Sequence, residues 1–210
     1  DRLLVGIYVD DLLITGADQE VIANFKLRME ELFKMTDLGL LSYYFGIEVQ
    51  QKPEGITQCQ EAYAKKIVES CSMEDCNPSH VPMKPCVVLS KKSEAPAVDA
   101  TEYRSVVRKL GYLTNTRPDL AYSVGMVSRF MEAPTTEHWT AVEHILRYIK
   151  GTTNFGCVYL REKKKKMVEL LGYSDSDMAG DVDDRKSTSG VAYFLGGSIV
   201  TWLSQKQKVV

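Results

Sequence analysis

The stretch LLVGIYVDDLLITG, residues 3–16, places two adjacent carboxylates, Asp10 and Asp11, in the middle of an otherwise apolar run. The surrounding residues are mostly β-branched or aliphatic, which predicts two short buried strands that meet at the acidic pair. Asp tolerates tight turns, so one interpretation makes the pair the solvent-facing tip of a β-hairpin. In the other, the strands hold two carboxylates side by side for a divalent cation such as Mg²⁺, which supports phosphoryl transfer.

The composition is that of a soluble globular protein. The 210 residues suffice for one or two domains, and 44% are hydrophobic and 26% charged. No apolar run reaches the length of a membrane span and no signal segment opens the chain, so we expect no membrane partner and an intracellular protein, cytoplasmic or nuclear. The chain begins with Asp1 shortly before a predicted strand. We interpret it as a piece of a longer polypeptide.

Charge is unevenly distributed along the chain. Residues 1–50 carry 4 Lys/Arg and 9 Asp/Glu, whereas residues 51–170 carry 18 and 14. The basic middle indicates a nucleic-acid face only weakly, because most surface charges are simply solvated. The five cysteines form an odd set without paired CxxC spacing, which argues against both a zinc site and a disulfide framework.

Periodicity and turn signals predict a mixed α/β (α+β) fold. The helical patterns cover about Asp18 to Lys34, a segment from Glu61, and three segments that begin at Asp99, at Pro118 and after APTTE, the last ending at Gly151. Residues 73–98 hold four of the seven prolines and indicate a long irregular linker. Hairpins are predicted at 43–60, with KPEG as the turn, and at GVAYFLGG–SIVTWL, and FGCVYL and MVELLGYS read as strands. Between those two strands, REKKKK indicates a solvated loop or, alternatively, a nucleic-acid contact.

YVDD between apolar strands resembles the Y-x-D-D motif of reverse transcriptases, and its surroundings resemble the polyprotein of copia-type retrotransposons. The blocks follow one another in family order: IYVDD, FKMTDLG, YFGIEV, YRSVVRKLGYLTNTRPDLAYSV, LRYIKGT, and YSDSDMAGD followed by RKSTSGVAYFLGG. Two positions depart from the family pattern, since Met178 stands where Trp is usual and Arg108 where Gly is common.

The resemblance assigns roles to residues near both predicted N-terminal hairpins. Asp10 and Asp11 match the acidic pair of the polymerase palm, which binds Mg²⁺, with Mn²⁺ as an alternative, and Asp10 is the expected direct ligand. Tyr8 and Val9 are expected beneath the primer terminus and the incoming deoxynucleoside triphosphate. The segment Tyr44 to Val49 is similar to the primer grip and assigns primer contacts to Tyr44, Phe45 and Gly46.

The same resemblance makes the later helices a thumb-like module on an RNA template paired with a DNA primer. Basic residues there either contact the duplex backbone or are only solvated: Lys65, Lys66, Arg108, Lys109 and Lys150. The expected domains are a palm part at 1–60, thumb-like or connection-like helices at 61–155, and the start of a ribonuclease H-like domain at 156–210.

The tail of the chain resembles the opening of a ribonuclease H domain, in which Asp175 occupies the position of a metal-binding, catalytic aspartate. The same segment places five residues at calcium-loop positions, but Lys186 stands where that loop requires a bidentate Glu. A calcium loop is therefore not expected.

Two functional hypotheses follow from the resemblance. In the first, the chain is a segment of an RNA-directed DNA polymerase with ribonuclease H, active by two-metal phosphoryl transfer in a full-length protein. In the second, it is a catalytically incomplete or degenerate fragment that binds nucleic acid weakly or not at all. A further metal-ligand Asp upstream in the same reading frame favours the first, and a start codon next to residue 1 favours the second. The sequence does not decide the oligomeric state.

Overall fold

The computed structural model describes residues 2–161 and 168–209. Two compact units divide the chain, Asp1–Leu41 and Ser42–Val210, and each is treated by itself. Helices and strands are mixed in the order that the periodicity predicts, so the mixed α/β class is confirmed. Most of the REKKKK stretch, residues 162–166, lies outside the described residues. Within the described residues, no helix has the length and apolar character needed to cross a bilayer.

The first unit is a hairpin with one helix. Strands β1 (Leu3–Tyr8) and β2 (Asp11–Gly16) pair antiparallel, and α1 (Gln19–Leu32) follows. The helix begins where the sequence indicates, because the Asp18 side chain accepts hydrogen bonds from the backbone N–H groups of Glu20, at 2.9 Å, and Val21, at 3.4 Å. The predicted hairpin and helix are thus confirmed.

The prediction of buried strands in this hairpin is wrong. Leu4 is 66% exposed and Ile7 is 74% exposed, and no residue of α1 is buried. The physical reason is that a two-stranded sheet covered by a single helix has too little surface to bury both of its faces. Apolar composition identified the strands correctly but did not reveal how many neighbours they have within the unit.

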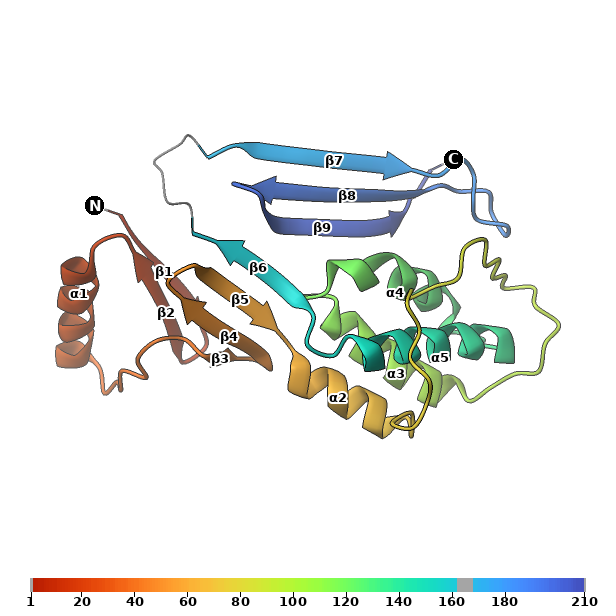
Figure 1. Cartoon of the computed structure of the whole chain (residues 1–210), viewed down its shortest axis with the longest axis horizontal. Coiled ribbons are helices and arrows are strands. Elements are labelled where there is room, and N and C mark those ends of the chain that lie inside the picture. Colours follow the sequence, from red (N-terminus) through yellow and green to blue (C-terminus); the bar gives the residue numbers. More distant parts are fainter. Residues whose placement is uncertain (1, 162–167, 210) are drawn as a thin grey trace. The chain divides into compact units, whose positions relative to one another are not determined.

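The second unit opens with a four-stranded antiparallel sheet. Its strands, in spatial order, are β3 (Tyr43–Tyr44), β4 (Ile47–Lys52), β5 (Gly55–Cys59) and β6 (Gly156–Leu160). The predicted hairpin at 43–60 is present, with Pro53 and Glu54 in its turn. Strand β6 lies beside β5 (Figure 1), although about a hundred residues separate them in the sequence. A side chain at Gly156 would come within 2.1 Å of the Gln58 carbonyl oxygen, so this close pairing requires glycine there.

Between β5 and β6 the chain forms a helical module. Its elements are α2 (Glu61–Ser70), α3 (Ala100–Leu113), α4 (Ala121–Val127), α5 (Thr136–Gly151) and two short 3₁₀ turns, Pro118–Leu120 and Ser128–Phe130. Fully buried side chains on successive helices, including Ile67, Tyr103, Leu110, Ile145 and Leu146, form one core. These are the positions that the helical periodicity marks. Among the tyrosines of the module, Tyr103 and Tyr148 are buried, whereas Tyr112 and Tyr122 are exposed.

The irregular linker between α2 and α3 is fastened to α5. The Ser79 backbone N–H donates to the Arg147 carbonyl oxygen at 3.1 Å, and the Arg147 side chain donates to the Asn77 carbonyl oxygen at 2.7 Å. Its far end pairs with the start of α5 through the bridge between Ala97 and Thr135. The segment is irregular as predicted, but it packs on the module as part of the fold.

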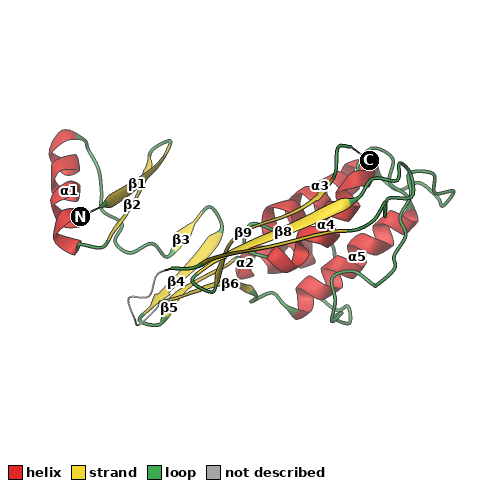
Figure 2. Cartoon of the chain, turned by 90° about the horizontal axis from the view of Figure 1, so that it is seen from above, coloured by secondary structure: helices red, strands yellow, loops and turns green. Residues whose placement is uncertain are grey.

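The chain ends in a three-stranded antiparallel sheet. Strands β7 (Leu170–Ser176), β8 (Thr188–Leu195) and β9 (Ser198–Lys206) lie in sequence order, with a turn at Gly196 and Gly197. Strand β9 packs against α4, and the sheet runs along one side of the helical module (Figure 2). The predicted hairpin at GVAYFLGG–SIVTWL is confirmed, and β7, which contains Asp175, pairs with its first strand.

Candidate active site and nucleic-acid interface

The acidic pair lies at the tip of the β1–β2 hairpin. Tyr8 pairs with Asp11, so Val9 and Asp10 form a two-residue turn and Asp11 is the first residue of β2. Val9 has φ +51°, a conformation that is rare for a β-branched residue and costs backbone strain. The expectation that both aspartates lie in the turn holds only for Asp10. The turn places the two carboxylates at the end of the two-stranded antiparallel ladder.

The Asp10 and Asp11 side chains are both exposed. Within residues 2–161 and 168–209, neither carboxylate has a hydrogen bond or an ion pair in the structure. Two adjacent carboxylates repel each other, and their oxygens are the ligands that hard divalent cations prefer. The donor chemistry therefore fits Mg²⁺ or Mn²⁺. In the same described ranges no three His, Cys, Asp or Glu side chains gather as a metal site would require, so the pair supplies only part of an octahedral ligand set.

The turn between β3 and β4 contains the expected primer-contact residues. Tyr44 pairs with Ile47, which leaves Phe45 and Gly46 as the two turn residues with φ +48° and +76°. The rings of Tyr44 and Phe45 meet edge to face at 4.4 Å, and the Phe45 side chain is 49% exposed. The Tyr112 hydroxyl of α3 donates a hydrogen bond to the Phe45 carbonyl oxygen. The turn thus displays an aromatic ring and is tied to the helical module.

Asp175 lies near the end of β7, opposite Gly190 of β8. Its carboxylate is exposed and accepts a hydrogen bond from the Ser176 backbone N–H at 2.8 Å. In the described part of the chain, Asp175 belongs to no group of three or more His, Cys, Asp or Glu side chains that could hold a metal ion. Asp175 is thus placed near a strand end, and its role as a metal ligand stays a prediction.

Three of the five basic residues expected on a duplex backbone make contacts within the chain. Lys65 pairs with Glu61 at 2.7 Å, and this contact raises the pKa of the Lys65 ammonium group. Lys109 donates to the Ser70 hydroxyl at 3.0 Å and Lys150 to the Cys76 carbonyl oxygen at 2.5 Å. Lys66 and Arg108 are exposed. Arg108 also lines a cavity of about 560 Å³ between α3, α4 and β9, which none of the other predicted site residues of this unit lines.

Glu48 has a role that the sequence did not reveal. Its carboxylate on β4 accepts a hydrogen bond from the Ala62 backbone N–H at 2.8 Å, in the first turn of α2. The N-cap residue Gln60 makes no side-chain capping bond of its own. Glu48 therefore substitutes for the missing cap and joins the sheet to the helix. The fourteen-residue separation hides this contact from any local capping pattern.

Arg117 organises a buried polar network that motif analysis also missed. The Arg117 side chain is 1% exposed and donates both to the Asp119 carboxylate and to the backbone and side-chain oxygens of Thr152 at 2.8 Å. The Tyr148 hydroxyl donates to the same carboxylate at 2.9 Å, and the guanidinium lies over the rings of Tyr148 and Phe155. A buried arginine requires such partners. The signal in the sequence that could have pointed to this network is the position of Arg117 next to Pro118 in TRPD.

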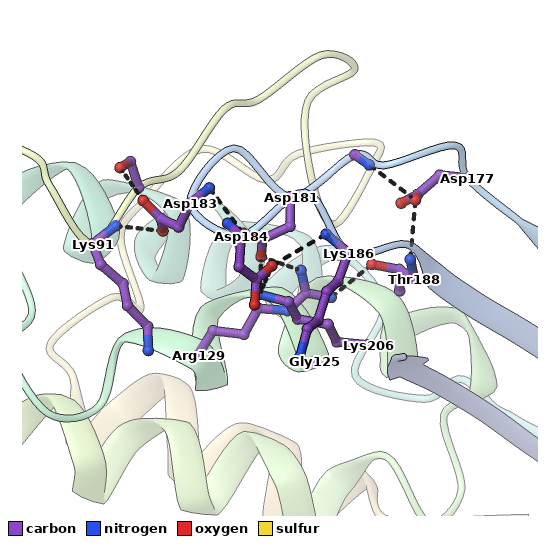
Figure 3. A network of polar contacts seen from close by, with 12 residues as sticks. Lys91, Gly125, Arg129, Asp177, Asp181, Asp183, Asp184, Lys186, Thr188 and Lys206 are labelled. Carbon is purple, nitrogen blue, oxygen red and sulfur yellow. Dashed lines mark hydrogen bonds and ion pairs between the residues drawn. The ribbon is translucent and has the colours of Figure 1, made fainter. Parts of the chain in front are cut away.

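Aspartates of the β7–β8 loop hold that loop against the helical module (Figure 3). Asp181 pairs with Lys206 of β9 at 2.5 Å and with Arg129 at 3.3 Å, and it accepts hydrogen bonds from two backbone N–H groups of its own loop. Although burial raises the pKa of Asp181, the contacts with Lys206 and with the backbone N–H groups of Asp183 and Asp184 lower it to about 2. The Asp183 carboxylate instead accepts hydrogen bonds from the Ser90 hydroxyl and the Lys91 backbone N–H in the linker. The loop aspartates therefore point to different partners and not to one centre.

Comparison with known proteins defines the class. Residues 1–85 match the family described as reverse transcriptase (RNA-dependent DNA polymerase). The chain is 41% identical over 204 residues to the retrovirus-related Pol polyprotein from transposon RE1 of Arabidopsis thaliana and 37% identical over 217 residues to that from transposon TNT 1-94 of Nicotiana tabacum. These matches cover 97% and 99% of this chain but only 14% and 16% of the polyproteins.

A third relative has a length close to that of the chain. An uncharacterized mitochondrial protein of Arabidopsis thaliana is 36% identical over 204 residues, a match that covers 97% of this chain and 83% of the relative. No solved structure gives a significant match. The chain belongs to the reverse transcriptase family of copia-type retrotransposon Pol polyproteins, and it corresponds to a segment of such a polyprotein.

Proposed function

We propose that the chain supplies Asp10 and Asp11 to the metal site of an RNA-directed DNA polymerase, within a longer polyprotein. The observation that carries this proposal is the strained two-residue turn that presents two adjacent carboxylates at a hairpin tip. Strain at such a position is typical of functional sites, and the matched family supports the reaction. The substrates are deoxynucleoside triphosphates and a DNA primer on an RNA template.

Each group of the chain has a distinct task in this mechanism. Bound divalent ions, Mg²⁺ or Mn²⁺, supply the charge that stabilises phosphoryl transfer. Asp10 holds a metal directly, and Asp11 contributes the second carboxylate from the start of β2. Tyr8 and Val9 form the floor beneath the primer terminus. The turn at Phe45 and Gly46 contacts the primer strand, with Tyr44 packed behind it.

A chimeric polyprotein tests the polymerase role. The homologous segment of the transposon RE1 polyprotein is replaced by this chain, and primer extension on an RNA template is measured. We expect extension by the chimera and its loss in Asp10→Asn, while Asp75→Asn, an equally exposed aspartate, extends normally. Extension that survives in Asp10→Asn, or a chimera that is inactive beside an active RE1 polyprotein, contradicts the proposal.

For the tail we propose the opening of a ribonuclease H domain, with Asp175 as a metal ligand. The sequential antiparallel order of β7, β8 and β9, and the position of Asp175 near a strand end, support it. In the chimera, Asp175→Asn should abolish cleavage of RNA in an RNA/DNA hybrid and spare primer extension. If Asp175→Asn abolishes both RNA cleavage and primer extension, or abolishes neither, a separate nuclease role is contradicted.

A second candidate function is a non-enzymatic, stand-alone protein. The observation that favours it is the Arabidopsis mitochondrial protein, of which this chain covers 83%. In that case the carboxylate pair is a relic, and the isolated chain has no affinity for Mg²⁺ above that of an Asp10→Asn, Asp11→Asn double variant. The chimeric polyprotein distinguishes the two candidates, because a relic carboxylate pair leaves it without primer extension, whereas a functional segment restores primer extension that Asp10→Asn abolishes.

A further inference from the structure

The β3–β4 turn has an unusual conformation. Phe45 and Gly46 both have left-handed φ values, +48° and +76°, as in the mirror-image turns that close two-residue hairpins. Glycine adopts this conformation readily, but for a bulky residue such as Phe45 it is an outlier. Something outside the hairpin must therefore compensate for the strain at Phe45.

The compensating contact comes from Tyr112 of α3. Its hydroxyl donates to the Phe45 carbonyl oxygen, and its ring lies against Gly46, within 4 Å of where a side chain there would begin. Tyr112 is itself fixed, because its ring packs edge to face on Tyr63 of α2 at 5.3 Å. The Tyr63 hydroxyl in turn donates to the Lys109 carbonyl oxygen at 3.4 Å. Two helices thus determine where the turn lies.

The hydrogen bond to Tyr112 also determines the orientation of a peptide group. In a planar trans peptide, the C=O of Phe45 and the N–H of Gly46 point in opposite directions. Since the C=O points at Tyr112, the Gly46 N–H points away from α3, and in the described part of the chain no group accepts a hydrogen bond from it. A hydrogen bond to the C=O polarises the peptide and strengthens its N–H as a donor.

The turn therefore presents an outward N–H donor beside a half-exposed aromatic ring. Backbone N–H groups are common donors to phosphate oxygens, and aromatic side chains stack on bases or sugars. We propose that Tyr112 is a positioning residue that aims the Gly46 N–H at a phosphate of the bound nucleic-acid strand, with the Phe45 ring alongside. This inference rests on the proposed primer contact of the turn and adds the residue that orients it.

Binding of an RNA/DNA hybrid by the 210-residue chain tests the inference. The probe is a fluorescein-labelled 20-base-pair hybrid with a recessed DNA 3′ end, and binding is followed by fluorescence anisotropy at several NaCl concentrations. Tyr112→Phe removes only the hydroxyl and should weaken binding about five-fold. It should also reduce the slope of log affinity against log salt by about one, the contribution of one phosphate contact. Tyr122→Phe, the same change at an exposed tyrosine of α4, should alter neither.

A second readout separates orientation from general weakening. The Gly46 amide resonance of ¹⁵N-labelled chain should shift when the hybrid is added to the parent and stay in place in Tyr112→Phe. Equal affinity, equal salt slope and equal amide shifts in parent and Tyr112→Phe overturn the role of Tyr112 and leave the proposed function intact. Absence of hybrid binding by the parent chain overturns the inference, whereas the proposed function is decided by the chimera.

Discussion

Arg117 and Asp119 form an ion pair whose two halves have different environments. The distance from Nη2 to Oδ2 is 2.7 Å, and the Arg117 side chain is 1% exposed whereas that of Asp119 is 32% exposed. The pair adjoins the Tyr148 hydroxyl and Thr152, and thereby connects the 3₁₀ turn after α3 to the end of α5. It anchors the middle of the helical module.

Replacing Arg117 should therefore destabilise the chain strongly. Arg117→Leu removes the hydrogen bonds that the buried guanidinium donates to the Asp119 carboxylate and to both Thr152 oxygens, and the loss of several hydrogen bonds from a charged group costs on the order of 3 kcal/mol. Urea unfolding followed by circular dichroism measures the change. Lys65→Ala, which removes the solvent-exposed pair with Glu61, serves as the control and should leave the free energy of unfolding nearly unchanged. Similar midpoints for both variants would show that the Arg117 network contributes little.

Glu48 should act as the N-terminal cap of α2. Glu48→Ala removes the acceptor for the Ala62 N–H and should lower the free energy of unfolding by about 1 kcal/mol, the usual cost of a lost cap. Glu54→Ala, in the turn of the same sheet, provides a matched control. Hydrogen exchange should accelerate at Ala62 in the first variant only, and unchanged exchange there would contradict the capping role.

The buried His138 should make the stability of the chain decrease in mild acid. Its Nδ1 accepts a hydrogen bond from the Thr135 N–H at 3.0 Å, and its Nε2 lies 3.1 Å from the Ser90 carbonyl oxygen. Burial lowers the pKa of His138, although the Ser90 carbonyl, Glu137 and Asp183 oppose the shift. The unfolded chain therefore binds a proton near pH 6.5 that the folded chain resists, and stability falls as the pH drops below that value.

Unfolding midpoints at pH 7.5 and 5.5 measure this effect. His138→Gln cannot titrate, so its midpoint should depend less on pH than that of the parent, even if it is lower at both values. His80→Gln, at an exposed histidine, should retain the pH dependence of the parent. If the parent, His138→Gln and His80→Gln all show the same pH dependence of the midpoint, other titratable groups cause it. His144, whose pKa burial also lowers, is the next one to replace.

The isolated 210-residue chain should not extend a primer. In the described residues no third carboxylate joins Asp10 and Asp11, and Mg²⁺ requires near-octahedral coordination and loses its waters reluctantly. Nucleotide incorporation with Mg²⁺ or Mn²⁺ is compared between the chain and its Asp10→Asn variant. Incorporation by the parent that disappears in the variant would show that the segment assembles a working site alone.

Sequence reasoning succeeded where the signal is local. The helices with a clear apolar face, such as α3 and α5, and the turns with glycine or an N-cap aspartate, such as Asp18, lie where the pattern predicts. Burial of β1 and β2 was predicted wrongly because apolar composition does not specify which other elements cover a strand. The pairing of β6 with β5 and the Arg117 and Glu48 contacts depend on residues distant in sequence, for which one chain without covariation carries no signal.

In the candidate site, too, the features with a local sequence signal were predicted and those that depend on distant residues were not. The motif located Asp10 and the hairpin tip, and the strand pattern located Asp175 at a strand end. The orientation of the Phe45–Gly46 peptide depends on Tyr112, which lies 67 residues further along the chain. The internal partners of Lys65, Lys109 and Lys150 likewise could not be read from charge alone, because a basic residue that contacts nucleic acid and one that contacts its own fold have the same sequence signature.

The register of β5 and β6 places Cys59 directly opposite Gly156. The chain consequently leaves the four-stranded sheet and returns to it at neighbouring points, so the helical module begins and ends beside the same pair of strands. Recombination between related elements could exchange residues 61–155 as a block without altering the order of the sheet.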